Sequence, residues 1–211
     1  MCIITDIKPH KKNSFMIYID NEYKFCLYKG EIKRFKLEIG SHISSDTVNI
    51  ILDEFIYKRA RERALYIIER NLKTEYEIRQ KLKEAKYPED IIERVIEMLI
   101  KYDFINDYNY AKMYIDYKVN SKSITAIKND LYKKHISNDI VSSILEESQI
   151  DESELIINLL EKKYYKFNLQ DLEDKRKVIN KLMYKGFKYN SIEEAINKFI
   201  KTRGRIWVKE F

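Results

Sequence analysis

The chain has 211 residues, of which 45% are hydrophobic and 35% charged, with only four glycines and two prolines. This mixture is typical of long amphipathic helices and excludes disorder as the main state of the chain. Its two cysteines, Cys2 and Cys26, argue against a disulfide framework, and no segment resembles a signal peptide or reaches the roughly 20 apolar residues of a membrane helix. We therefore expect a soluble, cytoplasmic protein without membrane contact.

The formal net charge of +6 suggests contact with nucleic acid, but this excess lies at the two ends of the chain. Residues 1–44 carry 8 basic and 5 acidic side chains, and residues 201–211 carry 4 and 1. Residues 45–200 between them carry 28 of each. A balanced body of this kind argues against a simple basic clamp on phosphates.

The first 44 residues alternate between apolar and polar in the manner of strands. Asp20 and Asn21 separate two of the runs and suit a tight hairpin turn, because both residue types tolerate left-handed geometry. The segment predicts a small antiparallel β-element. Its apolar positions are Ile3, Ile4, Ile7, Phe15, Ile17, Ile19, Tyr23, Phe25 and Leu27.

From Asp46 the apolar period becomes helical and predicts one long helix to about residue 70. Thr74 and Glu77 then form a capping-box pair that begins a helix running to about Ala85. Pro88 is expected in the first turn of the next helix, where its missing amide costs nothing. The stripe of the long helix consists of Val48, Ile51, Leu52, Phe55, Ile56, Leu65 and Ile68, and that of the last helix of Ile91, Ile92, Val95, Ile96 and Leu99.

This three-helix unit recurs along the chain at intervals of about 50 residues. The equivalent positions are the N-caps Thr74, Ser123 and Asp174, the apolar residues Ile78, Ile127 and Val178, the leucines Leu82, Leu131 and Leu182, and the later apolar residues Ile96, Leu145 and Ile196. We predict a mainly α fold of elongated tandem three-helix bundles. Its segments are a β-rich extension (1–44), three repeats (45–104, 105–150 and 151–200) and a basic tail (201–211).

Residues that would carry catalysis or bind a cofactor are missing from the sequence. The three histidines are widely separated, with no cysteine or carboxylate at metal-ligand spacing around them. Each glycine stands alone, so that no phosphate-binding loop can form. The carboxylates gather at helix ends, where they cap the next helix rather than form an acid–base pair. We expect no enzyme activity, no metal and no cofactor.

Two sets of residues carry a resemblance to a known family: Ala64–Arg70 with Thr74, Glu77, Ile78 and Leu82, and, at the junction between repeats, Ile92, Val95, Ile96, Leu99, Phe104–Asp107, Tyr110 and Ala111. Both resemble the RecX family, regulators of the RecA recombinase. Ile19–Tyr23 resembles the N-terminal extension of longer members from Gram-positive bacteria, and Gly186, Phe187 and Ile192 resemble the end of the third repeat. The chain departs from the family where Lys86, Asp103 and His135 replace glycine, and this puts the loop geometry in doubt.

The resemblance implies a monomer that binds the RecA filament on single-stranded DNA, with weak or RecA-dependent contact to the DNA itself. The expected outcome is inhibition of recombinase, ATPase and coprotease activities in DNA repair, recombination and the SOS response. A charge-balanced repeat surface suits a protein partner. The candidate contacts to RecA or DNA are Lys58, Arg59, Arg61, Arg63, Lys133, Lys134, Lys162, Lys163, Lys175, Arg176 and Lys177, each of which could equally be an ordinary solvated residue.

Two alternatives remain open from the residues. One is a direct nucleic-acid-binding protein in which the helices at 74–85 and 88–101 act as a helix-turn-helix, although the four carboxylates of the second helix would repel phosphate. The other is a helical scaffold for an unrelated partner. Binding to RecA with and without single-stranded DNA separates the three.

Overall fold

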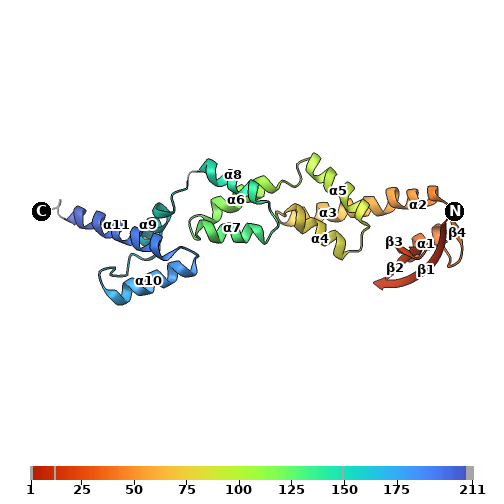
Figure 1. The fold of residues 1–211 in the computed structure, drawn as a ribbon. Coiled ribbons are helices and arrows are strands. Elements are labelled where there is room, and N and C mark those ends of the chain that lie inside the picture. Colours follow the sequence, from red (N-terminus) through yellow and green to blue (C-terminus); the bar gives the residue numbers. More distant parts are fainter. Residues whose placement is uncertain (1, 12, 149, 208–211) are drawn as a thin grey trace. The chain divides into compact units, whose positions relative to one another are not determined.

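The structure is a computed structural model that describes residues 2–11, 13–148 and 150–207, with side chains described as far as residue 202. The chain divides into two compact units, Met1–Asn106 (unit 1) and Asp107–Phe211 (unit 2). Both units are largely helical, and the strands lie in unit 1 (Figure 1). The predicted mainly α fold, with three-helix units after a small antiparallel sheet, is confirmed.

Unit 1 begins with the sheet and continues into helices. Its elements are β1 (Cys2–Lys11), β2 (Ser14–Ile19), β3 (Glu22–Tyr28), α1 (Lys29–Arg34), β4 (His42–Ile43), α2 (Ser45–Ile50), the π-helix η1 (Ile51–Tyr57), α3 (Lys58–Arg70), α4 (Glu75–Glu84) and α5 (Glu89–Lys101). Unit 2 contains α6 (Asp107–Lys118), α7 (Ile124–Tyr132), α8 (Asn138–Ser148), α9 (Glu152–Lys163), α10 (Leu172–Tyr184) and α11 (Tyr189–Trp207).

The strands form one antiparallel sheet in the order β3-β2-β1-β4. The predicted hairpin turn is confirmed: Asp20 and Asn21 have φ of 50° and 69°, and Ile19 pairs with Glu22 across the turn. Two successive left-handed residues define the tight turn that matches the twist of the strands. Alternate residues of the sheet face the helices, because period two places them on one side. The buried ones are Ile4, Ile17, Ile19, Phe25 and Leu27.

The long helix expected from Asp46 to residue 70 is continuous, but its middle is the π-helix η1. The extra residue of a π turn shifts the buried row, so that Ile51 is followed after five positions by Ile56 and then by Ala60 and Ala64. Beyond residue 56 the predicted stripe is therefore only partly right: Leu65 and Ile68 pack against the core but are half-buried, and Ala60 and Ala64 are the fully buried residues. The short helix α1 and the strand β4 were not predicted either.

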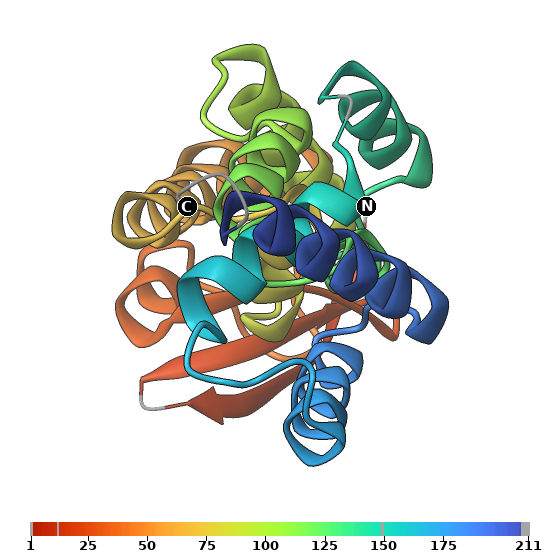
Figure 2. The same ribbon diagram turned by 90° about the vertical axis from the view of Figure 1, so that its left-hand side faces the viewer.

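The buried side chains form three clusters. The first contains the inner face of the sheet together with α2 to α5, so that the β-element and the first three-helix unit share one core. The second lies among α6, α7 and α8, and the third among α9, α10 and α11. Figure 2 shows α10 in light blue and α11 in dark blue. The predicted boundaries at residues 44, 104 and 150 remain predictions, and α11 continues to Trp207, into the predicted basic tail. The remainder of that tail, residues 208–211, lies outside the described residues.

The equivalent repeat positions occupy similar places in the three helical units. Leu82, Leu131 and Leu182 are completely buried, as are Ile78, Ile127 and Val178. Ile96 and Ile196 are also buried. Leu145 departs from this pattern: it is half-buried, and its neighbour Ile144 takes the core position.

The helix starts agree with the expected caps in two of the three units. The Thr74 and Ser123 hydroxyls accept hydrogen bonds from backbone amides of α4 and α7, and Glu77 completes the capping box. In the third unit the prediction is wrong by three residues, because Asp171 is the N-cap of α10 and its carboxylate accepts from the Asp174 amide. Pro88 is likewise the N-cap of α5 and not its first helical residue.

The same corner ends α4, α7 and α10. In each, the carbonyl oxygen of the buried leucine accepts a hydrogen bond from the backbone amide five residues later, at 3.2 to 3.3 Å. The residue just before that amide has a positive φ. That residue is Lys86 (63°), His135 (58°) or Gly186 (90°). This is a Schellman end, which glycine favours because it has no Cβ. The left-handed geometry is therefore kept where lysine and histidine replace glycine, as it is at Asp103 after α5 (55°).

Candidate functional site

The basic cluster of α3 contains one partly buried cation, Arg59, and three exposed cations. Arg59 has a side chain that is 24% exposed; it forms an ion pair with Glu31, donates to the Cys26 carbonyl oxygen and lies 4.4 Å from the centre of the Tyr28 ring. It therefore joins α3 to β3 and α1. Lys58 is exposed and paired with Glu54 one turn earlier. Arg61 and Arg63 are exposed and outside the ion pairs recorded for the described residues.

The basic candidates of unit 2 also differ in their surroundings. Lys133, Lys162, Lys163 and Arg176 are exposed. Lys134 lies 5.3 Å from the centre of the Tyr110 ring. On α10, Lys175 approaches Glu193 of α11 at 3.9 Å, whereas Lys177 lies 3.5 to 3.6 Å from Glu173 and Asp174 on its own helix. Of the candidate contacts, the cations most available to a partner are therefore Arg61, Arg63, Lys133, Lys162, Lys163 and Arg176.

Elsewhere in unit 1, cations and carboxylates compensate one another between helices. Arg79 of α4 binds Glu75 at 2.7 Å and reaches Glu93 of α5 with both terminal nitrogens, which holds the pKa of the Glu93 carboxyl below its ordinary value. Arg94 of α5 binds Asp53 of η1 at 2.7 Å. These pairs present both signs of charge on one surface, a pattern that fits an oppositely patterned protein face better than uniformly negative phosphates.

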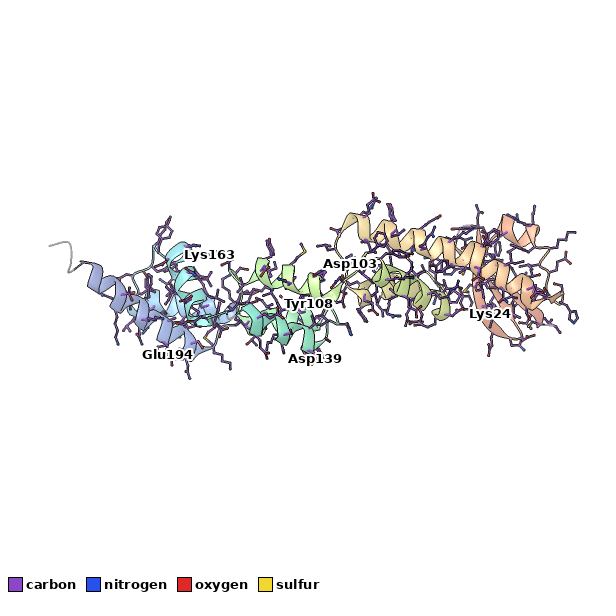
Figure 3. All side chains as sticks on the ribbon, turned by 90° about the horizontal axis from the view of Figure 1, so that it is seen from above. Lys24, Asp103, Tyr108, Asp139, Lys163 and Glu194 are labelled. Atoms are coloured by element: carbon purple, nitrogen blue, oxygen red, sulfur yellow. The ribbon has the colours of Figure 1, made fainter. Side chains whose placement is uncertain are left out.

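The sheet and the helices of unit 1 enclose a cleft of about 660 Å³. Its walls come from the β2–β3 hairpin, α2, η1 and the loop before α5. The charged residues that line it are mostly acidic: Asp20, Glu22, Lys24, Glu89 and Asp90. Figure 3 labels Lys24 on the strand beside it. Sequence reasoning missed this cleft because its walls are far apart along the chain.

Next to this cleft, one tyrosine joins the hairpin to the corner after α4. The Tyr23 hydroxyl donates to the Lys86 carbonyl oxygen and lies 3.6 Å from the Cys26 sulfur. Burial, followed by the contact with Cys26, raises the pKa of Tyr23 well above its ordinary value. Burial also raises the pKa of the Cys26 thiol, so that this cysteine is a poor nucleophile.

A second, apolar groove of about 450 Å³ lies on α3. Leu65, Tyr66, Ile68 and Phe104 form its floor, and Glu62 and Glu69 stand at its rim. Exposed aromatic and aliphatic side chains of this kind mark surfaces for protein partners.

The residues that the structure describes contain no group of three or more histidine, cysteine or carboxylate side chains that could hold a metal ion. Nor does any helix among them have the length and apolar character needed to cross a membrane. The features that the described residues offer to a partner include exposed cations, exposed aromatic residues, and the cleft and the apolar groove of unit 1.

Comparison with known proteins agrees with this picture. Residues 60–99 match the family model described as "RecX, first three-helix domain", and residues 150–196 match "RecX, third three-helix domain". A regulatory protein RecX from Clostridium acetobutylicum is 37% identical over 199 residues, covering 92% of this chain and 93% of the relative. Another from Clostridium tetani is 31% identical and covers 95% and 96%.

A solved structure of a regulatory protein RecX shares the fold as well. It superposes with a TM-score of 0.58 and 25% identity, covering 93% of this chain and 100% of the other. The first match begins in α3 and ends in α5, and the second begins just before α9 and ends in α11, so both coincide with three-helix units seen in the structure. Since these similarities extend over nearly the entire sequence of each relative, the chain belongs to the RecX family of regulatory proteins.

Proposed function

We propose that this protein binds the RecA filament on single-stranded DNA and inhibits its recombinase, ATPase and coprotease activities in DNA repair and recombination. The observation that carries the proposal is the similarity to regulatory RecX proteins over more than nine tenths of the chain. Membership of the RecX family implies a role in regulating RecA, and this makes RecA the proposed partner. The chain would act in the cytoplasm, as a monomer, without a cofactor.

The surface chemistry supports a protein partner. Ion pairs such as Arg79–Glu93 and Arg94–Asp53 neutralise the helical body of unit 1, while an apolar groove remains open on α3. The exposed cations Arg61 and Arg63 lie on the same helix, on either side of Glu62, and could contact acidic filament surface. Three helical units in series would make many modest contacts, which add only when neighbouring protomers are held at filament spacing.

The alternative, a helix-turn-helix protein that reads DNA, is disfavoured by α5. This helix would be the recognition helix, yet it carries Glu89, Asp90, Glu93 and Glu97. Two of these form ion pairs with α4: Glu89 with Lys83, and Glu93 with Arg79. These two cations of α4 are therefore already engaged by carboxylates. A groove-reading helix requires donors directed at bases and phosphates.

Equilibrium titrations against free RecA, bare single-stranded DNA and the assembled filament, each at two ionic strengths, test the proposal. The filament should bind most tightly and should lose less affinity with salt than bare DNA, because protein contacts release fewer counterions. Filament ATPase should then fall as the protein is added. Equal affinity for bare DNA and filament would favour the nucleic-acid-binding alternative instead.

A regulator without chemistry of its own should leave ATP intact. Protein shown free of RecA is therefore expected to release no phosphate from ATP, in the presence or absence of DNA. Turnover that persists through further purification would contradict the non-enzymatic assignment.

A further inference from the structure

Lysines gather in unit 2 where α10 passes the C-terminal end of α9. Lys181 lies in the last turn of α10, and Lys185, four residues later, is the C-cap of that helix, so that the two lie near each other at the end of α10. The Lys181 ammonium is 4.5 Å from the centre of the Phe167 ring and 5.9 Å from that of Tyr164, which places it beside the end of α9. Lys163 is the last residue of α9 and is exposed.

The second helical unit adds a further lysine near this end of α10. The Lys185 ammonium donates to the Ser121 carbonyl oxygen at 3.2 Å, and the Lys185 carbonyl accepts from the Ser123 amide at 3.1 Å. Lys122 lies between Ser121 and Ser123 in the sequence. Burial lowers the pKa of Lys185, and the positive charges of Lys163 and Lys122 lower it further. We call Lys122, Lys163, Lys181 and Lys185 the lysine strip.

Little negative charge compensates the lysine strip. Asp130 forms an ion pair with Lys122, and hydrogen bonds from Lys122 and Tyr114 outweigh burial to keep the pKa of Asp130 low. For Lys163, Lys181 and Lys185 the described residues provide no carboxylate partner within ion-pair distance. Figure 3 shows Lys163 and Glu194 on opposite sides of the third helical unit. Because like charges repel, this row favours a bound anion.

Exposed tyrosines flank the lysine strip. Tyr184 precedes Lys185 and is 94% exposed, and Tyr165 follows the end of α9 and is 57% exposed. The Lys166 ammonium lies 5.6 Å from the centre of the Tyr165 ring. A nearly bare aromatic ring beside cations is the arrangement that single-stranded nucleic acid uses, with phosphates on the cations and an unpaired base stacked on the ring. Duplex DNA cannot use such a ring, because its bases are already stacked.

We propose that the lysine strip and Tyr184 form a binding site for single-stranded nucleic acid, in which the ammonium groups hold two or more backbone phosphates and Tyr184 stacks on a base. This site deepens the proposed function, on which it rests for the identity of the strand as the single-stranded DNA of the RecA filament. Its location in unit 2 separates DNA contact from the neutralised surface and apolar groove of unit 1.

The test uses the full chain without RecA and a fluorescein-labelled 20-mer of thymidine, with binding followed by fluorescence anisotropy between about 50 and 200 mM salt. The variant Lys163→Gln/Lys181→Gln removes two exposed charges. It should weaken binding roughly tenfold or more at 50 mM salt and reduce the slope of log K against log salt by about 1.4, since each phosphate contact to a single strand contributes about 0.7. The matched control Lys29→Gln/Lys33→Gln removes the same charge from two exposed lysines of α1 and should leave the slope unchanged.

Tyr184 provides a second readout that does not depend on charge. Tyr184→Ala should weaken binding about tenfold, whereas Tyr184→Phe, which keeps the ring, should bind as the natural protein does. Because the Tyr184 side chain is exposed, both substitutions should leave the fold intact, and thermal unfolding of each variant checks this. A wild-type chain that does not bind the oligonucleotide, or an equal loss in the control variant, overturns the site.

Failure of the site and failure of the proposed function give different results. If the wild type binds the oligonucleotide through the lysine strip but has no added affinity for the RecA filament, the regulatory proposal is wrong and the site stands. If the filament is bound and inhibited equally by the wild type and by a strip variant that has also kept its oligonucleotide affinity, the regulatory proposal stands and the site is wrong.

Discussion

Replacing Gly186 by alanine should destabilise unit 2 by more than the replacement of Gly30 or Gly40 destabilises unit 1. Gly186 has φ of +90° at the corner between α10 and α11, where an L-residue loses about 1 to 2 kcal/mol. A Cβ at this position would also stand 2.7 Å from the Ser123 hydroxyl oxygen and 2.9 Å from the Ala126 Cβ. Crowding of this kind costs typically about 1 to 3 kcal/mol, so the expected total is roughly 2 to 5 kcal/mol.

Two other glycines separate these contributions. Gly40 has φ of +86° but open space around its would-be Cβ, so Gly40→Ala should lose only the backbone part, about 1 to 2 kcal/mol. Gly30 lies in α1 with open space and no positive φ, so Gly30→Ala should stabilise by about 0.5 to 1 kcal/mol. The excess of Gly186→Ala over Gly40→Ala thus measures how closely the α10–α11 corner packs on the start of α7.

Denaturant unfolding, followed by circular dichroism and by hydrogen exchange of amides in each unit, provides the free energies. Each loss is referred to the unit that carries the glycine, since the two units can unfold separately. If Gly186→Ala costs no more than Gly40→Ala, the close contact between the corner and α7 is absent in solution, and the packing of the second helical unit on the third would have to be reconsidered.

Three further predictions follow from buried contacts. Alanine at each equivalent leucine should lower the free energy of unfolding by about 2 to 5 kcal/mol, and losses under about 0.5 kcal/mol at all of them would contradict the repeat register; these positions are Leu82, Leu131 and Leu182. Arg59→Gln should lose about 1.5 to 3 kcal/mol of stability because it breaks the link to the sheet, whereas Arg61→Gln should change stability by less than about 0.5 kcal/mol; equal losses in thermal melts would refute the internal assignment of Arg59. Since folding raises the pKa of Tyr23 above its ordinary value of 10.0, its contribution is complete below pH 10 and is lost as the pH rises toward the higher folded-state value. Tyr23→Phe should therefore cost about 1 kcal/mol at pH 7 and make the alkaline loss of stability shallower, and an unchanged alkaline profile would exclude this role.

Local signals in the sequence were sufficient to predict the hairpin turn, two of the helix starts and the alignment of the three helical units. Capping side chains at Thr74 and Ser123, and a tight turn at Asp20 and Asn21, act within a few residues, so they could be recognised without the fold. The leucines of the three helical units were aligned by their spacing alone, and all three are buried. Resemblance to the family depended on the same apolar and capping residues, which specify an architecture more strongly than a site.

The fate of the charged residues was decided only by the tertiary structure. Lys58, Arg59, Arg61 and Arg63 are indistinguishable as a basic run, yet Arg59 turns inward to Glu31 because the sheet packs on that face of α3. Similarly, a π turn at Ile51–Tyr57 shifts the buried row, an effect that helical periodicity does not contain.

The lysine strip has the same origin. Lys122, Lys163 and Lys185 belong to three different helices or loops. Only the folded chain brings α10 to the segment that follows α9 and brings the end of α10 to the start of α7. Short-range rules of capping and periodicity set where helices begin and which face is apolar. Whether a cation finds a carboxylate, a carbonyl or open solvent depends on residues distant in sequence, and so only the folded chain determines it.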